Sequence, residues 1–263
     1  MEAGGVTASF DARAAVAPQV GAEHALPLLE HVGCLSSTRP CSRGLASRGM
    51  MALMERTPER RIVQADALAW MEANAPDPCA SVVTSLPDVS ELELEFDAWR
   101  AWFVDAARRV IRWTPEVGVA IFYQSDIRHR GAWIDKGYLV MRAAEEERAT
   151  LLWHKIVCRH PPGTIALGRP SYSHMLCVTR GSRGPMRRPG PDVLSGAGAM
   201  PWSRAMGVAA CRVACRFLRE ETETRVVVDP FCGRGTVLAV ANEMGLDALG
   251  VDISAKRCRA ARA

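Results

Sequence analysis

The sequence lacks several features that would place it at once in a particular class of protein. No apolar run reaches the roughly 18 residues that a membrane-spanning helix needs, which excludes a helical membrane protein. Lysine is scarce, since Lys136, Lys155 and Lys256 are the three lysines among 263 residues, and arginine carries almost all the positive charge. The nine cysteines include no Cys-x-x-Cys pair, which argues against the common zinc and dithiol motifs and indicates a reducing, intracellular compartment.

No metal site is predicted. Cys211 and Cys215 lie four apart in an expected helix and share one face, but no further ligand lies near them in the sequence. The histidines His154, His160 and His174 are too dispersed along the chain to suggest a ligand set.

The composition is that of an ordinary globular protein. Hydrophobic residues make up 48% of the chain and charged residues 24%, which suffices for a sizeable core. The net charge of +4 permits an acidic partner such as nucleic acid without requiring one. Arginine suits phosphate recognition, but a GC-rich genome would explain the same bias.

Residues 1–58 differ from the rest of the chain. They are rich in Ala, Gly, Ser and Arg, and a stretch such as CLSSTRPCSRGLASRGMM predicts a flexible N-terminal tail. An organelle transit peptide stays open, although the acidic residues Glu2, Asp11, Glu23 and Glu30 argue against it. Residues 59–263 are expected to form one domain.

In that domain, expected strands alternate with expected helices. The helices are predicted over 67–75, 96–113, 203–221 and 237–245, the second from apolar residues at helical spacing. Short β-branched runs predict the strands between them. The alternation favours an α/β fold with a largely parallel sheet.

The most informative segment is the glycine-rich stretch 226–245. A buried strand, VVVD, is followed by a tight turn with Gly233 and Gly235, and then by a helix that Thr236 opens. This geometry brings backbone N–H groups and a helix N-terminus up to a polar ligand. Asp252 ends the next expected strand, where an acidic residue can accept ribose hydroxyls. The dinucleotide fingerprint is absent, and no Gly-Lys-Ser/Thr follows, which excludes a P-loop.

The segment DPFCGRGTVLAVANEMGLDALGVDIS resembles motifs I and II of class I S-adenosylmethionine-dependent methyltransferases, in the form found in DNA and RNA amino-methyltransferases. The resemblance implies S-adenosyl-L-methionine as cofactor, with Asp252 on the ribose and Asp66 accepting from the adenine amino group. The other cofactor-binding residues that it implies are Asp229, Pro230, Phe231, Cys232, Gly233, Gly235 and Thr236.

The order of these pieces is similar to that of the circularly permuted β group of amino-methyltransferases. There the glycine loop comes last, as it does here, and the resemblance covers about 60–263. It implies a Rossmann-like, seven-stranded, mostly parallel sheet with helices on both faces. The strands of that sheet, in chain order, are expected at 61–66, 81–85, 119–124, 151–157, 174–180, 226–229 and 248–252.

The same resemblance makes Ser85, Leu86, Pro87 and Asp88 the catalytic tetrapeptide. The family motif is Asp/Asn/Ser-Pro-Pro-aromatic, in which a side chain and a backbone carbonyl accept from the target amino group and the ring stacks on the base. Ser85 and Pro87 match, whereas Leu86 and Asp88 depart from it. Asp88 could accept a proton, bind a cationic substrate or cap a helix that begins near Ser90. The aromatic residues that could replace the ring are Phe96, Tyr123 and Trp153.

The function implied is methyl transfer to an exocyclic amino group of DNA or RNA. No long recognition insert is present, so structured RNA, unpaired DNA, a protein partner or a homodimer all stay open. The alternatives are a non-catalytic nucleic-acid-binding subunit and a methyltransferase for protein or small molecules. The QSDIRHRG stretch is either a substrate-facing loop or a solvated turn. Basic loops that could meet phosphates, or simply be solvated, contain Arg159, Arg169, Arg183, Arg187 and Arg188.

Overall fold

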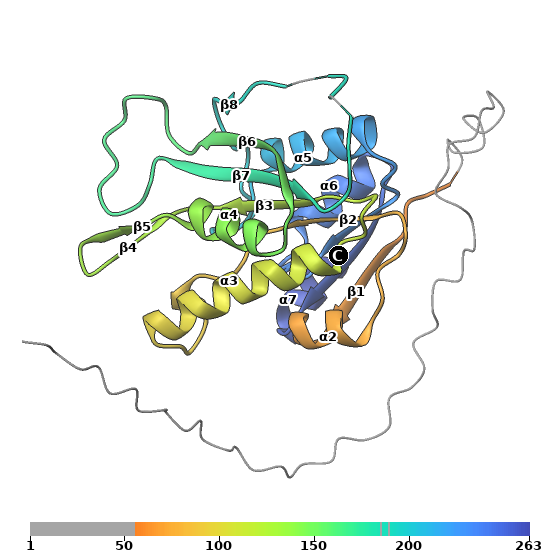
Figure 1. Cartoon of the computed structure of the whole chain (residues 1–263), viewed down its shortest axis with the longest axis horizontal. Coiled ribbons are helices and arrows are strands. Elements are labelled where there is room, and N and C mark those ends of the chain that lie inside the picture. The colour runs from red at the N-terminus through yellow and green to blue at the C-terminus, as the bar shows by residue number, and fades with distance from the viewer. Residues whose placement is uncertain (1–55, 185, 189) are drawn as a thin grey trace, which may run out of the picture. The chain divides into compact units, whose positions relative to one another are not determined.

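The computed structural model describes residues 56–263 apart from 185 and 189 (Figure 1). The predicted flexible tail, 1–58, therefore lies outside the described residues except at its last three positions. None of the helices in the described part is long and apolar enough to cross a membrane.

Ten strands and six α-helices follow one another in the described residues. The strands are β1 (Arg60–Gln64), β2 (Ala80–Thr84), β3 (Ala120–Gln124), β4 (Ile127–His129), β5 (Ala132–Ile134), β6 (Thr150–Cys158), β7 (Tyr172–Thr179), β8 (Val193–Leu194), β9 (Val226–Asp229) and β10 (Asp247–Asp252). The α-helices are α2 (Ala67–Ala73), α3 (Phe96–Trp113), α4 (Lys136–Glu146), α5 (Val208–Glu221), α6 (Thr236–Glu243) and α7 (Ala255–Arg262). A short 3-10 helix, η1 (Val89–Glu91), precedes α3.

The main sheet has the strand order β1-β10-β9-β2-β3-β7-β6-β8. The first five strands are parallel, and β7 runs antiparallel to both β3 and β6. The mostly parallel sheet is confirmed, but the predicted strand number of seven is wrong. Val193–Leu194 adds an eighth strand, parallel to β6, inside a stretch taken for a loop because two residues are too short to show a pattern.

The permuted order is also confirmed. Although β9 and β10 come last in the chain, they lie between β1 and β2, which come first. The chain leaves β9 through α6 toward β10, and leaves β2 through α3 in the opposite direction toward β3. The boundary between β9 and β2 is therefore a topological switch point, where parallel α/β sheets bind ligands beyond the carboxyl ends of the strands.

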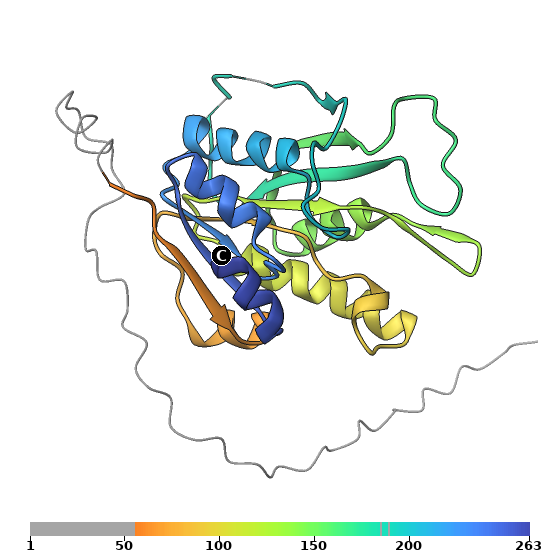
Figure 2. The same ribbon diagram turned by 180° about the vertical axis from the view of Figure 1, so that it is seen from behind.

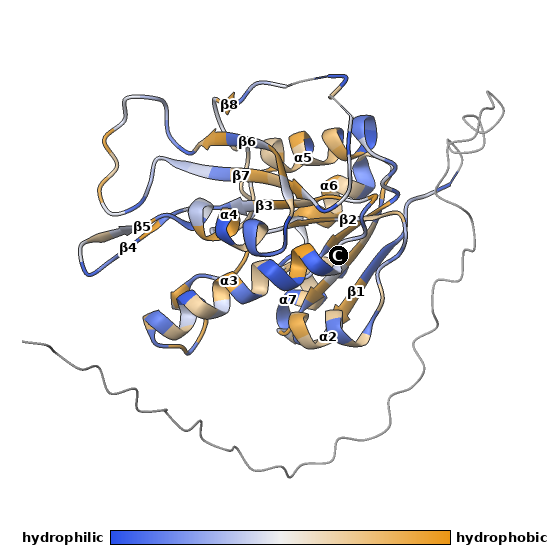
Figure 3. Ribbon diagram, viewed as in Figure 1, coloured by the Kyte–Doolittle hydropathy of each residue, from blue (hydrophilic) through white to orange (hydrophobic). Residues whose placement is uncertain are grey.

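Helices cover both faces of this sheet (Figures 1 and 2). Along β3, Ile121 and Tyr123 pack in the core with α5 and α6, while Ala120 and Phe122 pack in the core with α3 and α4. This is the two-residue alternation of a strand buried on both sides. Figure 3 accordingly shows apolar residues along the central strands and hydrophilic residues on the outer faces of the helices.

The structure refines two expected elements. The helix expected over 203–221 begins only at Val208, because its N-cap residue, Gly207, has an extended backbone. Gly207 packs closely on Ala197, where an added Cβ would lie 2.2 Å from the carbonyl oxygen. The QSDIRHRG stretch forms strand β4 and the exposed turn of the β4–β5 hairpin, so it contains the predicted solvated turn, and the prediction of a substrate-facing loop stays a prediction. The two turn residues of the hairpin, Arg130 and Gly131, both have positive φ, as a type I′ turn requires.

Candidate active site

A cavity of about 210 Å³ opens at the carboxyl ends of four neighbouring strands. Asp66 follows β1, Ser85 follows β2, Asp229 ends β9 and Asp252 ends β10, and all four line the cavity. The predicted cofactor residues and the start of the predicted tetrapeptide are thus brought to one place. Further lining residues from the predicted set are Leu86, Pro87, Pro230, Phe231, Cys232, Gly233 and Thr236.

The glycine loop requires its glycines. Gly233 and Gly235 have φ of +55° and +79°, and Gly235 is the N-cap residue of α6, which begins at Thr236. A Cβ on Gly233 would lie 2.7 Å from Cζ2 of Trp202, and a Cβ on Gly235 would lie 2.9 Å from Cβ of Ala261. Gly235 does not line the cavity but shapes the turn that does.

Asp252 and Asp66 each have a structural partner as well as a place on the cavity wall. Asp252 accepts hydrogen bonds from the N–H groups of Gly233 (3.0 Å) and Ser254 (2.7 Å), which ties the end of β10 to the glycine loop. Asp66 accepts from the N–H of Ala69 at 2.9 Å and so caps α2. Each carboxylate is thereby held at the end of its strand.

Asp229 is the buried acid of the site. Its Oδ1 accepts hydrogen bonds from Thr84 Oγ1 (2.7 Å) and from the N–H of Phe231 (3.2 Å). Burial raises the pKa of Asp229 to about 7, although both hydrogen bonds act to lower it. The bond to Thr84 joins the end of β9, where the glycine loop begins, to the end of β2, where the tetrapeptide begins.

The tetrapeptide lies where two cavities meet. Ser85 and Leu86 line the large cavity and also a second cavity of about 80 Å³. Leu86 packs its side chain into the core under α3, and the Pro87 carbonyl accepts a hydrogen bond from Trp99 Nε1 at 3.2 Å. These two contacts with α3 hold the loop in position.

Asp88 faces the second cavity only. It is the N-cap residue of η1, as the capping interpretation expected, and its N–H donates to Glu91 Oε1 at 3.3 Å. Its carboxylate also forms an ion pair with Lys136, a buried lysine that lines the same cavity. Sequence reasoning missed Lys136, because no motif links positions 48 residues apart.

The three candidate replacements for the missing ring have different surroundings. Tyr123 lines the second cavity. Phe96 is instead stacked on His129, with ring centroids 3.9 Å apart, and Trp153 packs edge-on against Phe217. Neither Phe96 nor Trp153 lines either cavity.

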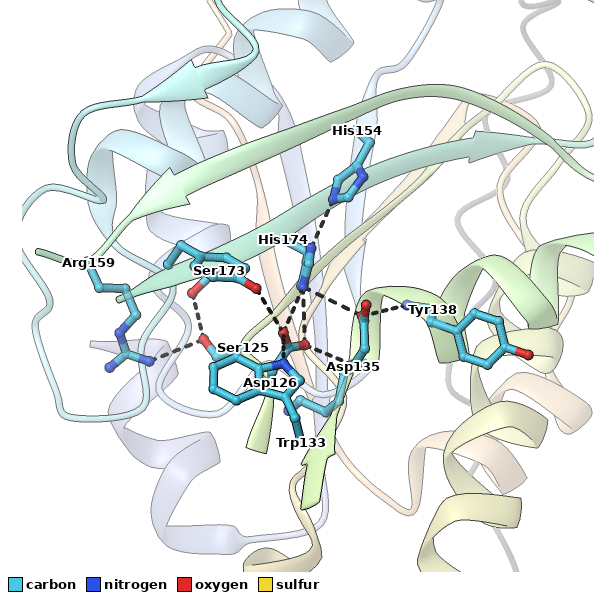
Figure 4. Close-up of polar contacts among 11 residues, drawn as sticks. Ser125, Asp126, Trp133, Asp135, Tyr138, His154, Arg159, Ser173 and His174 are labelled. Carbon is cyan, nitrogen blue, oxygen red and sulfur yellow. Dashed lines mark hydrogen bonds and ion pairs between the residues drawn. The ribbon is translucent and has the colours of Figure 1, made fainter. Parts of the chain in front are cut away.

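Two histidines that are dispersed in the sequence meet in the fold. Because β6 and β7 pair antiparallel, His154 and His174 are neighbours, with His154 Nε2 and His174 Nδ1 2.9 Å apart (Figure 4). His174 Nε2 lies 3.1 Å from both carboxylate oxygens of Asp126, so His154, His174 and Asp126 form a row of three side chains. The pKa of His154 is lowered by burial and by the neighbouring His174.

Asp126 holds the base of the β4–β5 hairpin. Its carboxylate also accepts hydrogen bonds from Trp133 Nε1 (3.0 Å) and from the N–H of Lys136 (2.8 Å). Burial acts to raise the pKa of Asp126, but the hydrogen bonds from His174, Lys136 and Trp133 outweigh it and keep the pKa low. Ligand atoms of Asp126, Asp135 and His174 lie within 4.8 Å of one another, the spacing of a possible cation site. The protein donors around Asp126 indicate a structural hydrogen-bond network instead.

The large cavity is lined from the stretch before α5, where a helix was expected from Ser203 onward, by Trp202, Arg204, Ala205 and Met206. Arg204 forms an ion pair with Glu91 at 2.7 Å, and Arg257 of α7 lies 3.7 Å from both Glu91 and Asp252. The Arg257 guanidinium also lies 5.9 Å from the centre of the Trp202 ring. These contacts connect the stretch before α5 to η1 and α7.

Comparison with known proteins agrees with this geometry. No curated protein matches the chain by sequence. Residues 218–263, which contain the glycine loop, match the model of a DNA methylase family. A solved structure named as a DNA modification methylase from Thermus thermophilus, complexed with S-adenosyl-L-methionine, matches with a TM-score of 0.60 and 20% identity, covering 77% of this chain and 91% of that chain.

A second solved structure, PvuII DNA methyltransferase (cytosine-N4-specific), matches with a TM-score of 0.61 and 16% identity, covering 78% of this chain and 86% of that one. The chain has the methyltransferase fold. The M1.HpyAVI–SAM complex also matches, with a TM-score of 0.53 and 12% identity over 77% of this chain and 98% of that one. The predicted fold class and the predicted resemblance to permuted amino-methyltransferases are therefore confirmed.

Proposed function

We propose that the protein is an S-adenosyl-L-methionine-dependent methyltransferase that acts on an exocyclic amino group of nucleic acid. One observation carries the proposal: Ser85 and Leu86 form a wall shared by the glycine-loop cavity and the second cavity. In-line transfer requires donor and acceptor atoms about 3–3.5 Å apart, so their two sites must touch. The family match at 218–263 and the shared fold support this assignment.

The residues of the large cavity fit the cofactor. Two carboxylates, Asp66 and Asp252, can accept from amino and hydroxyl groups of a nucleoside, and Phe231 and Trp102 supply apolar wall. The absence of a Cβ at Gly233 leaves the loop backbone close to the cavity. When bound, S-adenosyl-L-methionine supplies the electrophilic methyl group.

The protein's own contribution is to orient and activate the acceptor. Ser85 Oγ and the Leu86 carbonyl are two acceptors for the two hydrogens of an exocyclic amino group. Hydrogen bonds to both make the nitrogen a better nucleophile as positive charge develops on it. The buried core contact of Leu86 and the bond from Trp99 to the Pro87 carbonyl keep these acceptors in place.

Charge around the second cavity favours nucleic acid over a protein amine as the acceptor. Four cationic side chains line it, those of Lys136, Arg159, Arg169 and Arg204, against two carboxylates, Asp88 and Glu91. Lys136 pairs with Asp88 and Arg204 with Glu91, so the surplus is positive. A cationic acceptor such as a lysine side chain would be repelled, whereas phosphates would be attracted. A nucleic-acid substrate would also place the protein inside the cell.

The test is incubation with tritium-labelled S-adenosyl-L-methionine and either DNA, RNA or protein, with calorimetry of cofactor binding in parallel. We expect label in DNA or RNA, and Asp252→Ala should abolish cofactor binding. Asp247→Asn, at the other end of β10, is the control and should bind normally. Ser85→Ala should lower turnover at least tenfold while cofactor binding is kept.

Label in protein alone would contradict the nucleic-acid assignment. Cofactor binding without transfer to any of the three substrates would favour the non-catalytic subunit instead. Absence of cofactor binding in the native protein would overturn the proposal entirely.

A further inference from the structure

Lys136 is an unusual residue for its position. It is one of only three lysines, its side chain is 3% exposed, and lysine is rarely buried to this degree without a specific partner. Its ammonium pairs with Asp88 and lies 5.8 Å from the centre of the Phe103 ring. Asp88 is the one hydrogen-bond partner of Lys136 Nζ among the described residues, and an ammonium carries three N–H donors. Donors therefore remain for a ligand in the second cavity, which Lys136 lines.

The backbone at Lys136 is held in place from several sides. Its N–H donates to Asp126, which His174 and Trp133 also contact. Figure 4 shows Asp126, His174 and Trp133 together, with His154 joined to the far side of the His174 ring. At the next residue, Gly137, a Cβ would lie 2.9 Å from the His174 ring, so the start of α4 packs closely on β7. Such a frame is rigid, as a residue that selects a ligand requires.

The Asp88 carboxylate makes the burial of the Lys136 ammonium possible and holds it at the second cavity. The carboxylate balances the charge of the ammonium and stands where the resembling motif has a stacking ring. With no ring at this position, the wall of the second cavity offers polar groups: Ser85 as an acceptor and Lys136 as a donor. Adenine and cytosine each present an amino group next to a ring nitrogen that accepts hydrogen bonds, which matches this pair.

We infer that Lys136, fixed by Asp88, is a specificity-determining residue that donates a hydrogen bond to the ring nitrogen beside the target amino group. The acceptor base is then held by its edge rather than by stacking on a ring at position 88. This inference rests on the proposed function, since it assumes that a base enters the second cavity. Lys136 would then select bases that have a hydrogen-bond-accepting ring nitrogen next to the amino group.

The test compares bases that stack equally but differ in that nitrogen. A short single-stranded oligothymidylate carries one central adenine or cytosine, or instead 1-deazaadenine or 3-deazacytosine. Binding is measured by fluorescence anisotropy with S-adenosyl-L-homocysteine present, which prevents turnover. We expect the native protein to bind the adenine or the cytosine strand about tenfold more tightly than its deaza analogue, because one charge-assisted hydrogen bond is lost.

Lys136→Met should bind both strands of the pair equally, whereas Lys256→Met, at an exposed lysine, should keep the tenfold preference. Equal binding of both strands by the native protein would overturn the inference, and this comparison needs no variant to fold. A preference that survives in Lys136→Met would overturn it as well. If the native protein binds none of these strands, the inference is overturned, and the labelling experiment with DNA, RNA and protein decides the proposed function separately.

Discussion

At the scale of single residues, the carboxyl of Asp229 joins β9 to β2 through Thr84 and lines the large cavity, at 4% exposure. Burial disfavours the ionised form and raises the pKa of Asp229 to about 7. Because the folded protein binds this proton more tightly than the unfolded chain does, stability falls as the pH rises from about 4 through 7.

We therefore expect Asp229→Asn to have little effect on the free energy of unfolding at pH 3, where Asp229 is protonated in both the folded and the unfolded state. At pH 8 the variant should be more stable than the native protein by roughly 3–4 kcal/mol, because it avoids the ionised form. Urea denaturation at both pH values measures this difference. Asp105→Asn, in an exposed pair with Arg109, should show no such dependence on pH. Equal effects of Asp229→Asn at both pH values would contradict the prediction.

At the scale of elements, helix α3 positions the tetrapeptide although it contributes little to the cavity wall. Its apolar residues recur at helical spacing and pack in the core with β2 and β3. The fully buried Trp99 donates to the Pro87 carbonyl, so the helix determines where the loop after β2 lies. The spacing predicted the helix and its buried face. The bond to Pro87 could not be predicted, because it depends on how the loop turns back over α3.

Trp99→Phe should cost about 2 kcal/mol in the free energy of unfolding, since it leaves a carbonyl unpaired and a smaller ring in the core. It should lower kcat/KM for methyl transfer about tenfold, because the acceptors at Ser85 and Leu86 lose their support. Trp113→Phe is the matched control, since Trp113 also donates to a carbonyl, that of Asn74, but away from both cavities. An equally large loss of kcat/KM in Trp113→Phe would mean that the hydrogen bond to the Pro87 carbonyl does not cause the loss in Trp99→Phe.

At the scale of the whole molecule, the strand order assembles the site from both ends of the described chain. Asp66 and Ser85 come early and Asp229 and Asp252 late, yet β1, β2, β9 and β10 end at the same edge of one sheet. Because the cavity draws on four strands, a bound cofactor stabilises the native fold as a whole. Binding to the folded state alone adds about 2.7 kcal/mol at 100 times the dissociation constant.

Saturating S-adenosyl-L-methionine should accordingly raise Tm by roughly 5–10 °C in a thermal-shift experiment. Gly233→Ala should abolish this rise, because its Cβ would collide with Trp202 at a positive φ. Gly245→Ala is the control: it has a φ of +81° but no atom within 4 Å of the added Cβ. It should lower Tm by backbone strain alone and keep the cofactor-induced rise. A rise retained in Gly233→Ala would show that the glycine loop does not contact the ligand.

The sequence by itself determined the α/β class, the permuted strand order and the position of the glycine loop. The class and the loop follow from local causes: β-branched runs buried on both faces, glycines at positive φ, and apolar residues at helical spacing. The permuted strand order was implied by the resemblance to the β group of amino-methyltransferases. The site residues from Ser85 to Asp88 and from Asp229 to Asp252 could be named because each group is contiguous in the chain.

Only the tertiary structure decided which distant side chains meet. The Asp88–Lys136 pair and the contact between His154 and His174 depend on strand register and on where α4 begins. The two-residue strand β8 and the place of Trp202 and Arg204 on the cavity wall depend on packing in the same way. Such contacts leave no periodic pattern, because a register shift of one residue would turn His174 away from His154 with no change in the sequence. The sequence therefore indicated a methyltransferase site, and the fold determined which side chains, such as Lys136, line the cavity beside Ser85.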